Sequence, residues 1–345
     1  LVLGGHRTMA EITTPYDNLV RRHGVRLVRD TVARVDPAKK VAVLASGPTI
    51  AYDKLILSPG IELVFDSIQG LKAAHESGQI LQAWKAGPET AALRRQLEAM
   101  PDGGVFVMSV PIAPYRCPPG PYERACTVAN YFKKAKPKSK IILLDGNPDL
   151  ASKKALFTDA WSTLYAGMID YRPNNAPFAV NAATMTVTTE FDEVKGDVLN
   201  VVPRQRAGEV CEMAGVRNDA NGIWCVVNLA TFESNAVPNV HIIGDSILSN
   251  LPKSGHMATN HAKVCAAAIV ELLAGRQPDP VPVIANTCYS ATSDTTSGYV
   301  ATVFRHEPGK GYVAQPEGGA TSKGDELNFA YNESWAKNIW AQMLG

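Results

Sequence analysis

The feature that most constrains the fold is a strand–helix–strand run between residues 103 and 145. "GGVFVMSV" (103–110) and "SKIILLD" (139–145) are short apolar runs, which are typical of buried strands. Between them, "PYERACTVANYFKKAKP" (121–137) has a proline at its start and lysines in its last turn, as helices prefer. Two strands joined by a crossover helix pair in parallel. The sequence therefore predicts an α/β fold built on a βαβ unit.

Other segments extend this pattern on both sides. The expected elements are several short strands over 25–60, an amphipathic helix over 87–100, a small meander over 178–203, a buried strand over 239–246 and a long helix over 254–275. After residue 279 the composition shifts to Thr, Ser, Gly and aromatic residues, which suggests a separate tail domain.

Composition excludes several classes of function. The formal net charge is +1, so a nucleic-acid partner, which would require a basic face, is not expected. No run of eighteen apolar residues predicts a membrane span. The six cysteines form no C-x-x-C pair and no metal-ligand spacing, so no metal site is expected, and counting alone favours inert core thiols. They are Cys117, Cys126, Cys211, Cys225, Cys265 and Cys288.

The bend that follows the first strand of the βαβ unit carries unusual chemistry. In a dinucleotide site it would read G-x-G-x-x-G, so that backbone N–H groups reach a pyrophosphate. Here it reads "VPIAPYRCPPGPYE", and its five prolines lack N–H donors, so no NAD site is expected. Cys117 lies just before the helix, whose dipole would lower the pKa of a thiol. Glu123, in the first turn, would either exchange protons with that thiol or complement the dipole.

Two further segments indicate a flavin. In "TFESNAVPNVHIIGD" (231–245) an apolar strand ends on Gly244-Asp245. There the glycine would allow the backbone to approach a flavin closely, and the aspartate carboxylate would accept a hydrogen bond from a ribityl hydroxyl group. The helix that begins near Ser254, with Lys253 beside it, would direct positive charge at the flavin pyrimidine. The other segment is "YDKLILSPG" (52–60). The alternative interpretation of Gly-Asp is an ordinary strand–turn–helix with a capping residue. The cofactor-binding residues that we expect are Val32, Ser58, Pro59, Gly60, Gly244, Asp245, Lys253 and Ser254.

With these segments the chain resembles the flavoprotein subunit of flavocytochrome c sulfide dehydrogenase, a relative of sulfide:quinone reductases within the disulfide-oxidoreductase superfamily. The resemblance extends over almost the whole length. It is carried most specifically by "RCPPGPYERA" and "NTCYS", and also by "YDKLILSPGIEL", "WKAGPETAALRRQLEAMPDGG", "PRQRAG", "TFES", "IGDS" and "PKSGHMA". It implies two Rossmann-like domains of the glutathione-reductase type and a C-terminal α+β interface domain.

The resemblance also implies a domain division. Residues 1–64 and 218–278 would form the FAD-binding domain, 65–217 a nicotinamide-domain-like unit without an NAD site, and 279–345 the interface domain. The family's flavoprotein begins with a strand and a G-x-G-x-x-G loop, and it carries an early cysteine that tethers FAD covalently. Neither is present here, so either a few dozen residues precede the printed sequence or the protein binds FAD poorly. We expect the former, and the sequence leaves covalent and non-covalent flavin open.

The resemblance further implies that Cys117 and Cys288 form a redox disulfide beside the flavin. The sequence alone could not pair them, because Cys126 is a nearer candidate for Cys117. Hydrosulfide would attack this disulfide, Glu123 would manage protons, and FAD would receive two electrons. Which cysteine takes the sulfide is not fixed by the sequence. Cys126, Cys211, Cys225 and Cys265 are expected to be structural.

The electron acceptor and location also follow from the resemblance. The chain has no C-x-x-C-H motif, so haem c would lie on a partner cytochrome subunit, in a heterodimer in the periplasm. Three alternatives are a sulfide:quinone reductase, an NADH-dependent disulfide reductase and a flavin-free binding or assembly subunit. The polar tail "SKGDELNFAYNESW" favours a soluble acceptor over a membrane quinone. Tyr331, Trp335 and Trp340 would cover the flavin or form the docking surface, although aromatic residues at this spacing more often simply pack.

Overall fold

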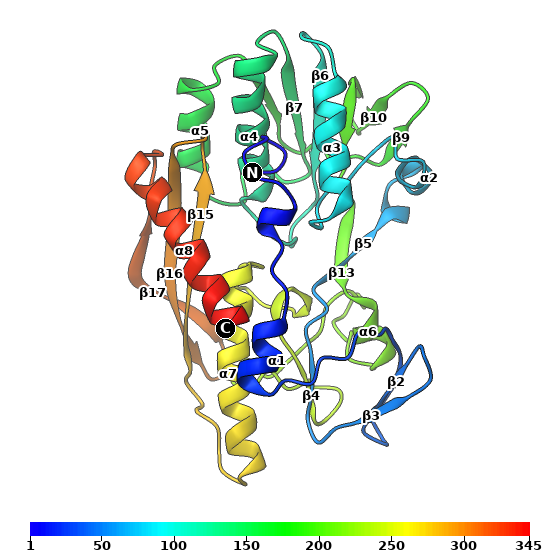
Figure 1. Ribbon diagram of the computed structural model, residues 1–345, viewed down its shortest axis with the longest axis vertical. Helices are drawn as coiled ribbons and strands as arrows, with labels where there is room; N and C mark the ends of the chain where they lie inside the picture. Colours follow the sequence, from blue (N-terminus) through cyan, green and yellow to red (C-terminus); the bar gives the residue numbers. More distant parts are fainter.

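The structure is a computed structural model that describes residues 1–345. Its central sheet has four parallel strands in the order β12-β6-β7-β8. These strands are β6 (Val105–Val110), β7 (Lys140–Asp145), β8 (Ile169–Arg172) and β12 (Val198–Asn200). Helix α4 (Gly120–Ala135) joins β6 to β7, so the predicted βαβ unit and the α/β class are confirmed (Figure 1).

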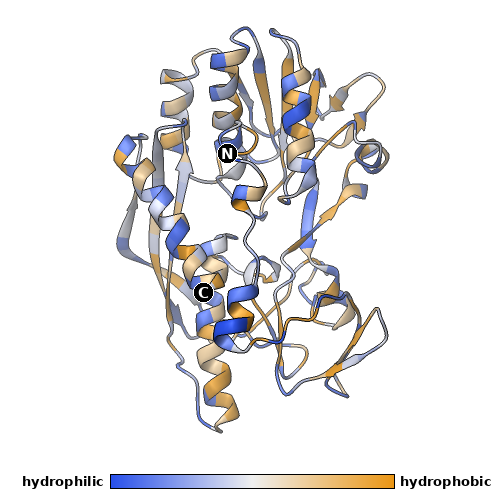
Figure 2. Cartoon of the chain, in the orientation of Figure 1, coloured by the Kyte–Doolittle hydropathy of each residue, from blue (hydrophilic) through white to orange (hydrophobic).

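The alternation of side chains along these strands explains the layers. Phe106 and Met108 of β6 belong to a core shared with α3 (Pro88–Ala99), α4 and α5 (Lys154–Thr163), whereas Val107 belongs to a second core on the opposite face. A small antiparallel sheet covers that opposite face; it consists of β9 (Ala179–Asn181), β10 (Thr186–Thr188) and β11 (Glu193–Lys195). In Figure 2 the helices α3 and α4 carry both hydrophobic and hydrophilic residues, as helices with one buried face must.

A second half is built around a shorter parallel pair. Strand β14 (Val240–Ile242) lies beside β4 (Leu55–Leu57), with Ile242 opposite Leu57. Helix α7 (Gly255–Leu273) follows β14 and packs Met257 and Cys265 into the core of this half. Its other elements are β1 (Val32–Asp36), β2 (Val41–Leu44), β3 (Thr49–Ala51) and α6 (Glu209–Met213). The antiparallel pair β5 (Ile61–Val64) and β13 (Arg204–Ala207) runs between the two halves in Figure 1.

The C-terminal part is an antiparallel sheet crossed by one helix. Its strands are β15 (Val283–Ala291), β16 (Ser297–Glu307) and β17 (Gly311–Ala320). Helix α8 (Glu326–Leu344) begins at Asp325, whose side chain accepts the N–H of Asn328, and it packs against β15 and β16 (Figure 1). The remaining helices are α1 (Asp17–His23) and α2 (Leu71–Glu76), with 3-10 turns at Ala10–Ile12, Phe65–Ser67 and Gly244–Ser246.

Two predicted elements differ from the structure. The strand expected from residue 25 begins only at Val32, and the preceding residues are exposed and irregular. The strand expected over 239–246 ends at Ile242, because Gly244 turns the chain with a φ of 73° into a 3-10 turn. The domain boundaries given above stay a prediction. None of the helices is both long enough and apolar enough to cross a bilayer.

Candidate active site

Cys117 lies in the connection from β6 to α4, in a left-handed backbone conformation with a φ of 61°. Its N–H donates to the carbonyl of Lys253 at 2.7 Å, and its own carbonyl accepts the N–H of Gly120 at 2.8 Å. A Cβ at Gly120 would lie 2.9 Å from Cys117 Sγ, so only glycine fits there without displacing the sulfur. The first turn of α4 therefore fixes the position of the thiol.

Three N–H groups of this connection, including that of Cys117, are used within the protein. Ala113 donates to Asn147 Oδ1 at 2.9 Å, and Arg116 donates to Gln205 Oε1 at 2.8 Å. Asp145, at the end of β7, accepts hydrogen bonds from Tyr122 and Asn147, and burial raises the pKa of its carboxyl group. These bonds and the prolines reduce the number of backbone donors available to a pyrophosphate; the absence of an NAD site stays a prediction.

Cys288 lies on β15, opposite Val300 of β16. Cys117 and Cys288 are both free thiols and line one cavity of about 740 Å³. Cys126, the nearer candidate in the sequence, is instead fully buried in the core under α4 and does not line this cavity. Two cysteines that are remote in the chain are thus brought to one site.

The pKa of each thiol is raised rather than lowered. Desolvation raises the pKa of Cys117 to about 12; Cys288 and Glu123 act in the same direction, and Lys153 and Arg116 oppose them. Desolvation also raises the pKa of Cys288, where Lys153 opposes it. The expectation that a helix dipole lowers the Cys117 pKa is therefore wrong. Helix α4 begins only at Gly120, and the loss of solvation outweighs its field.

Glu123 connects the two cysteine-bearing elements. It lies in the first turn of α4 and lines the cavity, and its Oε1 accepts the N–H of Ala291 on β15 at 3.0 Å. This bond holds α4 against the strand that carries Cys288. The carboxylate thus lies on the same cavity as both thiols and complements the N-terminus of α4, while its proton-exchanging role stays a prediction.

The Gly-Asp turn lies at the carboxyl end of β14. Gly244 donates its N–H to His261 Nδ1 at 3.2 Å, and Asp245 lines the cavity with a carboxyl pKa that burial raises. Lys253 donates to the carbonyls of Asp245 and Ile247, each at 2.7 Å. Its ammonium lies 3.8 Å from the centre of the Trp224 ring, and desolvation lowers its pKa to about 8.

Ser254 caps the N-terminus of α7, which faces the cavity. Its Oγ accepts the N–H of Met257 at 3.1 Å and donates to Asn286 Oδ1 at 2.6 Å. The N–H groups of Gly255 and His256 have no partner inside the helix, and both residues line the cavity. The positive end of the α7 dipole therefore faces this space.

The other predicted cofactor-binding residues lie at the edge of the site or away from it. Ser58 follows β4, and its Oγ is 3.7 Å from where a Cβ of Gly244 would lie. The carbonyl of Gly60 accepts the Ser246 hydroxyl at 2.6 Å, and Pro59 contacts Gly208. Val32 packs against the core of the second half. None of these four residues lines the cavity, so their flavin contacts stay a prediction.

Several residues of the cavity were not predicted as site residues. Of the three aromatic residues of the tail, Trp335 and Trp340 line the cavity, whereas Tyr331 lies outside it. Arg124 directly follows Glu123 in the motif, so adjacency was an available signal. Lys153 does not line the cavity but contacts Cys288 from the start of α5, and nothing in the sequence marks it. The unpredicted lining residues include Trp84, Arg116, Arg124, His256, Thr287, Tyr289, Trp335, Ile339, Trp340 and Met343.

The residues around the cavity fit a flavin ring. Trp84, Trp335 and Trp340 supply flat apolar walls, and the buried indole N–H of Trp335 has no hydrogen-bond partner in the chain. The α7 N-terminus offers donors at one end, and the thiols lie in the same space. An aromatic ring system with carbonyl acceptors suits such a site.

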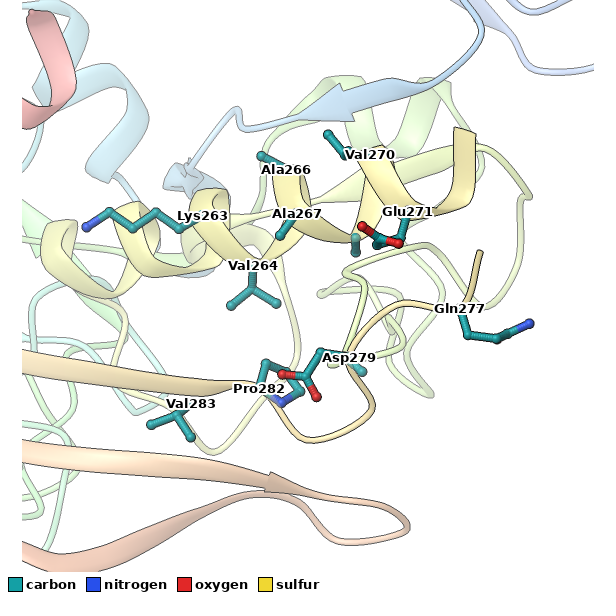
Figure 3. A pocket seen from close by; sticks show the side chains of 12 residues that line it. Lys263, Val264, Ala266, Ala267, Val270, Glu271, Gln277, Asp279, Pro282 and Val283 are labelled. Atoms are coloured by element: carbon teal, nitrogen blue, oxygen red, sulfur yellow. The ribbon is translucent and has the colours of Figure 1, made fainter. Parts of the chain in front are cut away.

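A second hollow, of about 790 Å³, lies along the C-terminal half of α7 and the start of β15 (Figure 3). Ala266, Ala267 and Val270 form much of its wall, with Lys263 and Glu271 beside them. It contains no cysteine and no aromatic residue. No group of three or more His, Cys, Asp or Glu side chains comes together as a metal site.

Two family models match separate parts of the chain. Residues 90–203 match the family model of the sulfide dehydrogenase (flavocytochrome c) flavoprotein chain, central domain. Residues 280–344 match the flavin-binding model of flavocytochrome c sulphide dehydrogenase. Both cysteines lie within the matched ranges.

Two curated relatives are mitochondrial sulfide:quinone oxidoreductases. The protein from Mus musculus is 25% identical over 254 residues, and that from Dictyostelium discoideum is 26% identical over 242 residues. Each match covers 67% of this chain and 52% of the relative, so the chain spans about half the length of these proteins.

Solved structures share the fold. The sulfide:quinone oxidoreductase of Aquifex aeolicus superposes with a TM-score of 0.76 at 18% identity, covering 98% of this chain and 80% of that one. An NAD-dependent persulfide reductase from A. fulgidus gives a TM-score of 0.60 at 12% identity, covering 89% and 63%. At these identities the likeness concerns the fold alone.

Proposed function

The chain belongs to the flavoprotein family of flavocytochrome c sulfide dehydrogenase, and from this premise we propose that it oxidises hydrosulfide through a Cys117–Cys288 disulfide and a bound FAD. The observation that carries the proposal is the placement of both thiols on one cavity with the N-terminus of α7 and the Asp245 turn. A soft sulfur nucleophile is captured by thiol–disulfide exchange, which a disulfide at this site would provide.

The residues of the chain have distinct tasks in this scheme. FAD, when bound, supplies a two-electron acceptor. Asp245, Ser254 and the N–H groups of Gly255 and His256 would hold it, with the α7 dipole favouring negative charge on its pyrimidine side. Arg116 and Arg124 line the same cavity and attract an anionic substrate. Glu123 accepts or donates the proton of the sulfur species near both thiols, while its bond to Ala291 keeps α4 and β15 together.

The proposed acceptor is a c-type cytochrome subunit with which the chain forms a heterodimer in the periplasm. The family to which the two models belong supports this choice, and the polar residues that precede α8 and form its first half are consistent with a soluble partner. Any covalent link to FAD would come from a cysteine outside the printed sequence, since the four other cysteines are fully buried.

A quinone is the second candidate acceptor. It is favoured by the names of the curated relatives and by exposed apolar side chains on α8, among them Leu327 and Trp340. The two acceptors differ in a direct assay. Sulfide-reduced protein would be reoxidised by added cytochrome c in one case and by a short-chain quinone in the other.

The test of the function itself is an absorption spectrum of the purified holoprotein before and after anaerobic addition of sulfide. We expect flavin bands that bleach with sulfide, and haem bands where a cytochrome copurifies. A colourless protein, or flavin bands that sulfide leaves unchanged, would refute the proposal and favour a flavin-free binding subunit.

A further inference from the structure

Lys153 brings a positive charge directly to one of the two thiols. Its Nζ lies 3.5 Å from Cys288 Sγ and donates to Ser290 Oγ at 2.8 Å. Cys288 and Ser290 are two positions apart on β15, so they present their side chains on the same face, toward the lysine. Lys153 itself is only 9% exposed and has a left-handed backbone with a φ of 52° at the N-cap of α5.

The lysine makes no ion pair with a carboxylate, so its charge is not neutralised by a neighbour; its only side-chain partners are the thiol and the serine hydroxyl. A buried lysine without an acidic partner is costly unless an anion forms beside it. The side chain 3.5 Å away that can become an anion is the Cys288 thiol. A non-glycine residue held at positive φ is also a strained conformation of the kind that collects at functional sites.

The surroundings of the two sulfurs are not equivalent. The negative charge of Glu123 raises the pKa of both thiols and so disfavours a thiolate. The positive charge of Arg116, in the connection before α4, favours a thiolate at Cys117 without a hydrogen bond to it. Lys153 acts on both through space, but it contacts only Cys288 through a hydrogen bond. The hydrogen-bonded charge is the stronger interaction.

We propose that Lys153 selects Cys288 as the leaving thiolate, so that hydrosulfide adds to Cys117. The inference rests on the proposed function and assigns the step that the sequence left open. In this step a bond forms between the hydrosulfide sulfur and Cys117 Sγ, and the Cys117–Cys288 bond breaks. The products are a Cys117 persulfide and a Cys288 thiolate, so the substrate sulfur is oxidised and the disulfide is reduced by the same two electrons.

The assignment agrees with the access route to the site. Cys117 shares the cavity wall with Arg116 and Arg124, where an anion is attracted, and its neighbour Gly120 has no side chain of its own to cover the sulfur. A thiolate at Cys288 then lies on the cavity that would hold FAD, next to the ammonium group of Lys153. Lys153 therefore acts on a reacting atom, although it lies outside the motif that carries Cys117.

The test is the pH dependence of alkylation of each thiol in reduced holoprotein, followed by peptide mass spectrometry with iodoacetamide. In the wild-type protein Cys288 should react with a lower apparent pKa than Cys117, since the thiolate is the nucleophile. Lys153→Met should slow alkylation of Cys288 about tenfold at neutral pH, which corresponds to about one pKa unit, and affect Cys117 less. Lys153→Arg keeps the charge and should retain most of the rate.

Lys154→Met is the matched control, because Lys154 is the next residue but is exposed and paired with Asp149. It should leave both profiles unchanged. A second measurement needs no variant: oxidised wild-type protein is treated with sulfide, and the persulfide is trapped and located. Persulfide on Cys288, or equal pKa values for both thiols, would overturn the inference. Protein that does not react with sulfide but keeps the Lys153-dependent Cys288 profile would refute the proposed function and leave the charge pairing intact.

Discussion

Two strand-to-helix connections meet at the cavity, and they have been used in opposite ways. The connection from β14 to α7 keeps a glycine at positive φ and leaves N–H groups of the helix start open to the cavity. The connection from β6 to α4 is filled with prolines, and the N–H groups of Ala113, Arg116 and Cys117 donate within the protein. The same architecture thus offers a cofactor site at one turn and a rigidly held thiol at the other. What decides between them is whether backbone donors stay free.

The largest effect on the reaction is expected when either cysteine of the site is replaced. Cys117→Ser and Cys288→Ser should each reduce sulfide-driven flavin bleaching to background, because a hydroxyl forms no disulfide, while the flavin spectrum remains. Stopped-flow absorbance in anaerobic buffer measures this. Cys126→Ala is the matched control; it removes a buried core thiol at a cost of about 1 kcal/mol and should keep the reaction. Full activity in either serine variant would contradict the disulfide role.

A smaller effect is expected from filling the space beside Cys117. In Gly120→Ala the new methyl group would lie 2.9 Å from Cys117 Sγ and 3.0 Å from the Trp84 ring. Such overpacking costs about 1–3 kcal/mol and displaces the sulfur. We expect slower sulfide reaction with flavin content unchanged. Gly87→Ala, before α3 and with no atom within 4 Å of its Cβ, should be neutral, and an equal loss in both variants would argue against the packing explanation.

The other turn is probed by Gly244→Ala. A side chain at its φ of 73° costs about 1–2 kcal/mol, and the turn that places Asp245 would relax. We expect the protein to lose flavin more readily, as measured by the flavin-to-protein absorbance ratio after dialysis. Gly222→Ala has a similar φ of 64° in open space. It should lose similar stability yet retain flavin; flavin loss in both would mean that strain alone is responsible.

The smallest effect concerns pH. The Lys253 pKa is lowered to about 8 in the folded protein, below its value near 10.4 in an unfolded chain. The unfolded chain then binds more protons above pH 8, so this lysine makes the folded state more stable as pH rises. The free energy of unfolding should increase by about 1 kcal/mol between pH 7 and 8.5, relative to Lys253→Met. Urea unfolding of both proteins at each pH provides the measurement.

The Cys117 thiol has the opposite effect on how the free energy of unfolding changes with pH. Its folded-state pKa is about 12, above the unfolded value, so its contribution is lost as pH rises from about 9 toward 12. The Lys253 measurement is therefore made below pH 9, in reduced protein. A flat pH difference between wild type and Lys253→Met would mean that the lysine is more solvated than the structure indicates.

Local patterns in the sequence predicted most of the fold. The apolar runs at β6 and β7 and the proline start of α4 are determined by neighbouring residues, so their prediction was confirmed. The turn at Gly244 shortened a predicted strand, since a single positive φ is not visible in hydrophobicity. The predicted direction of the Cys117 pKa shift was wrong, because burial of the thiol and its nearness to Cys288 arise only in the tertiary structure.

The candidate site was less accessible to sequence reasoning. The partnership of Cys117 with Cys288 came from resemblance, and the structure places both on one cavity. Lys153 could not have been found, because its contact with Cys288 joins the start of α5 to the middle of β15. Trp335 carries no signal beyond its aromatic character, and its neighbours are decided by how α8 crosses the sheet.

The hydrogen bond from the Cys117 N–H to the Lys253 carbonyl links the two halves of the molecule. Each half has its own hydrophobic core. The position of Cys117 Sγ in the cavity therefore depends on how the two halves are placed relative to each other. A substitution that lets the halves slide against each other would shift the thiol without touching it. In a mutational screen, substitutions at such positions would lower activity as catalytic substitutions do. These positions would lie along the interface between the two cores and not around the reacting sulfurs.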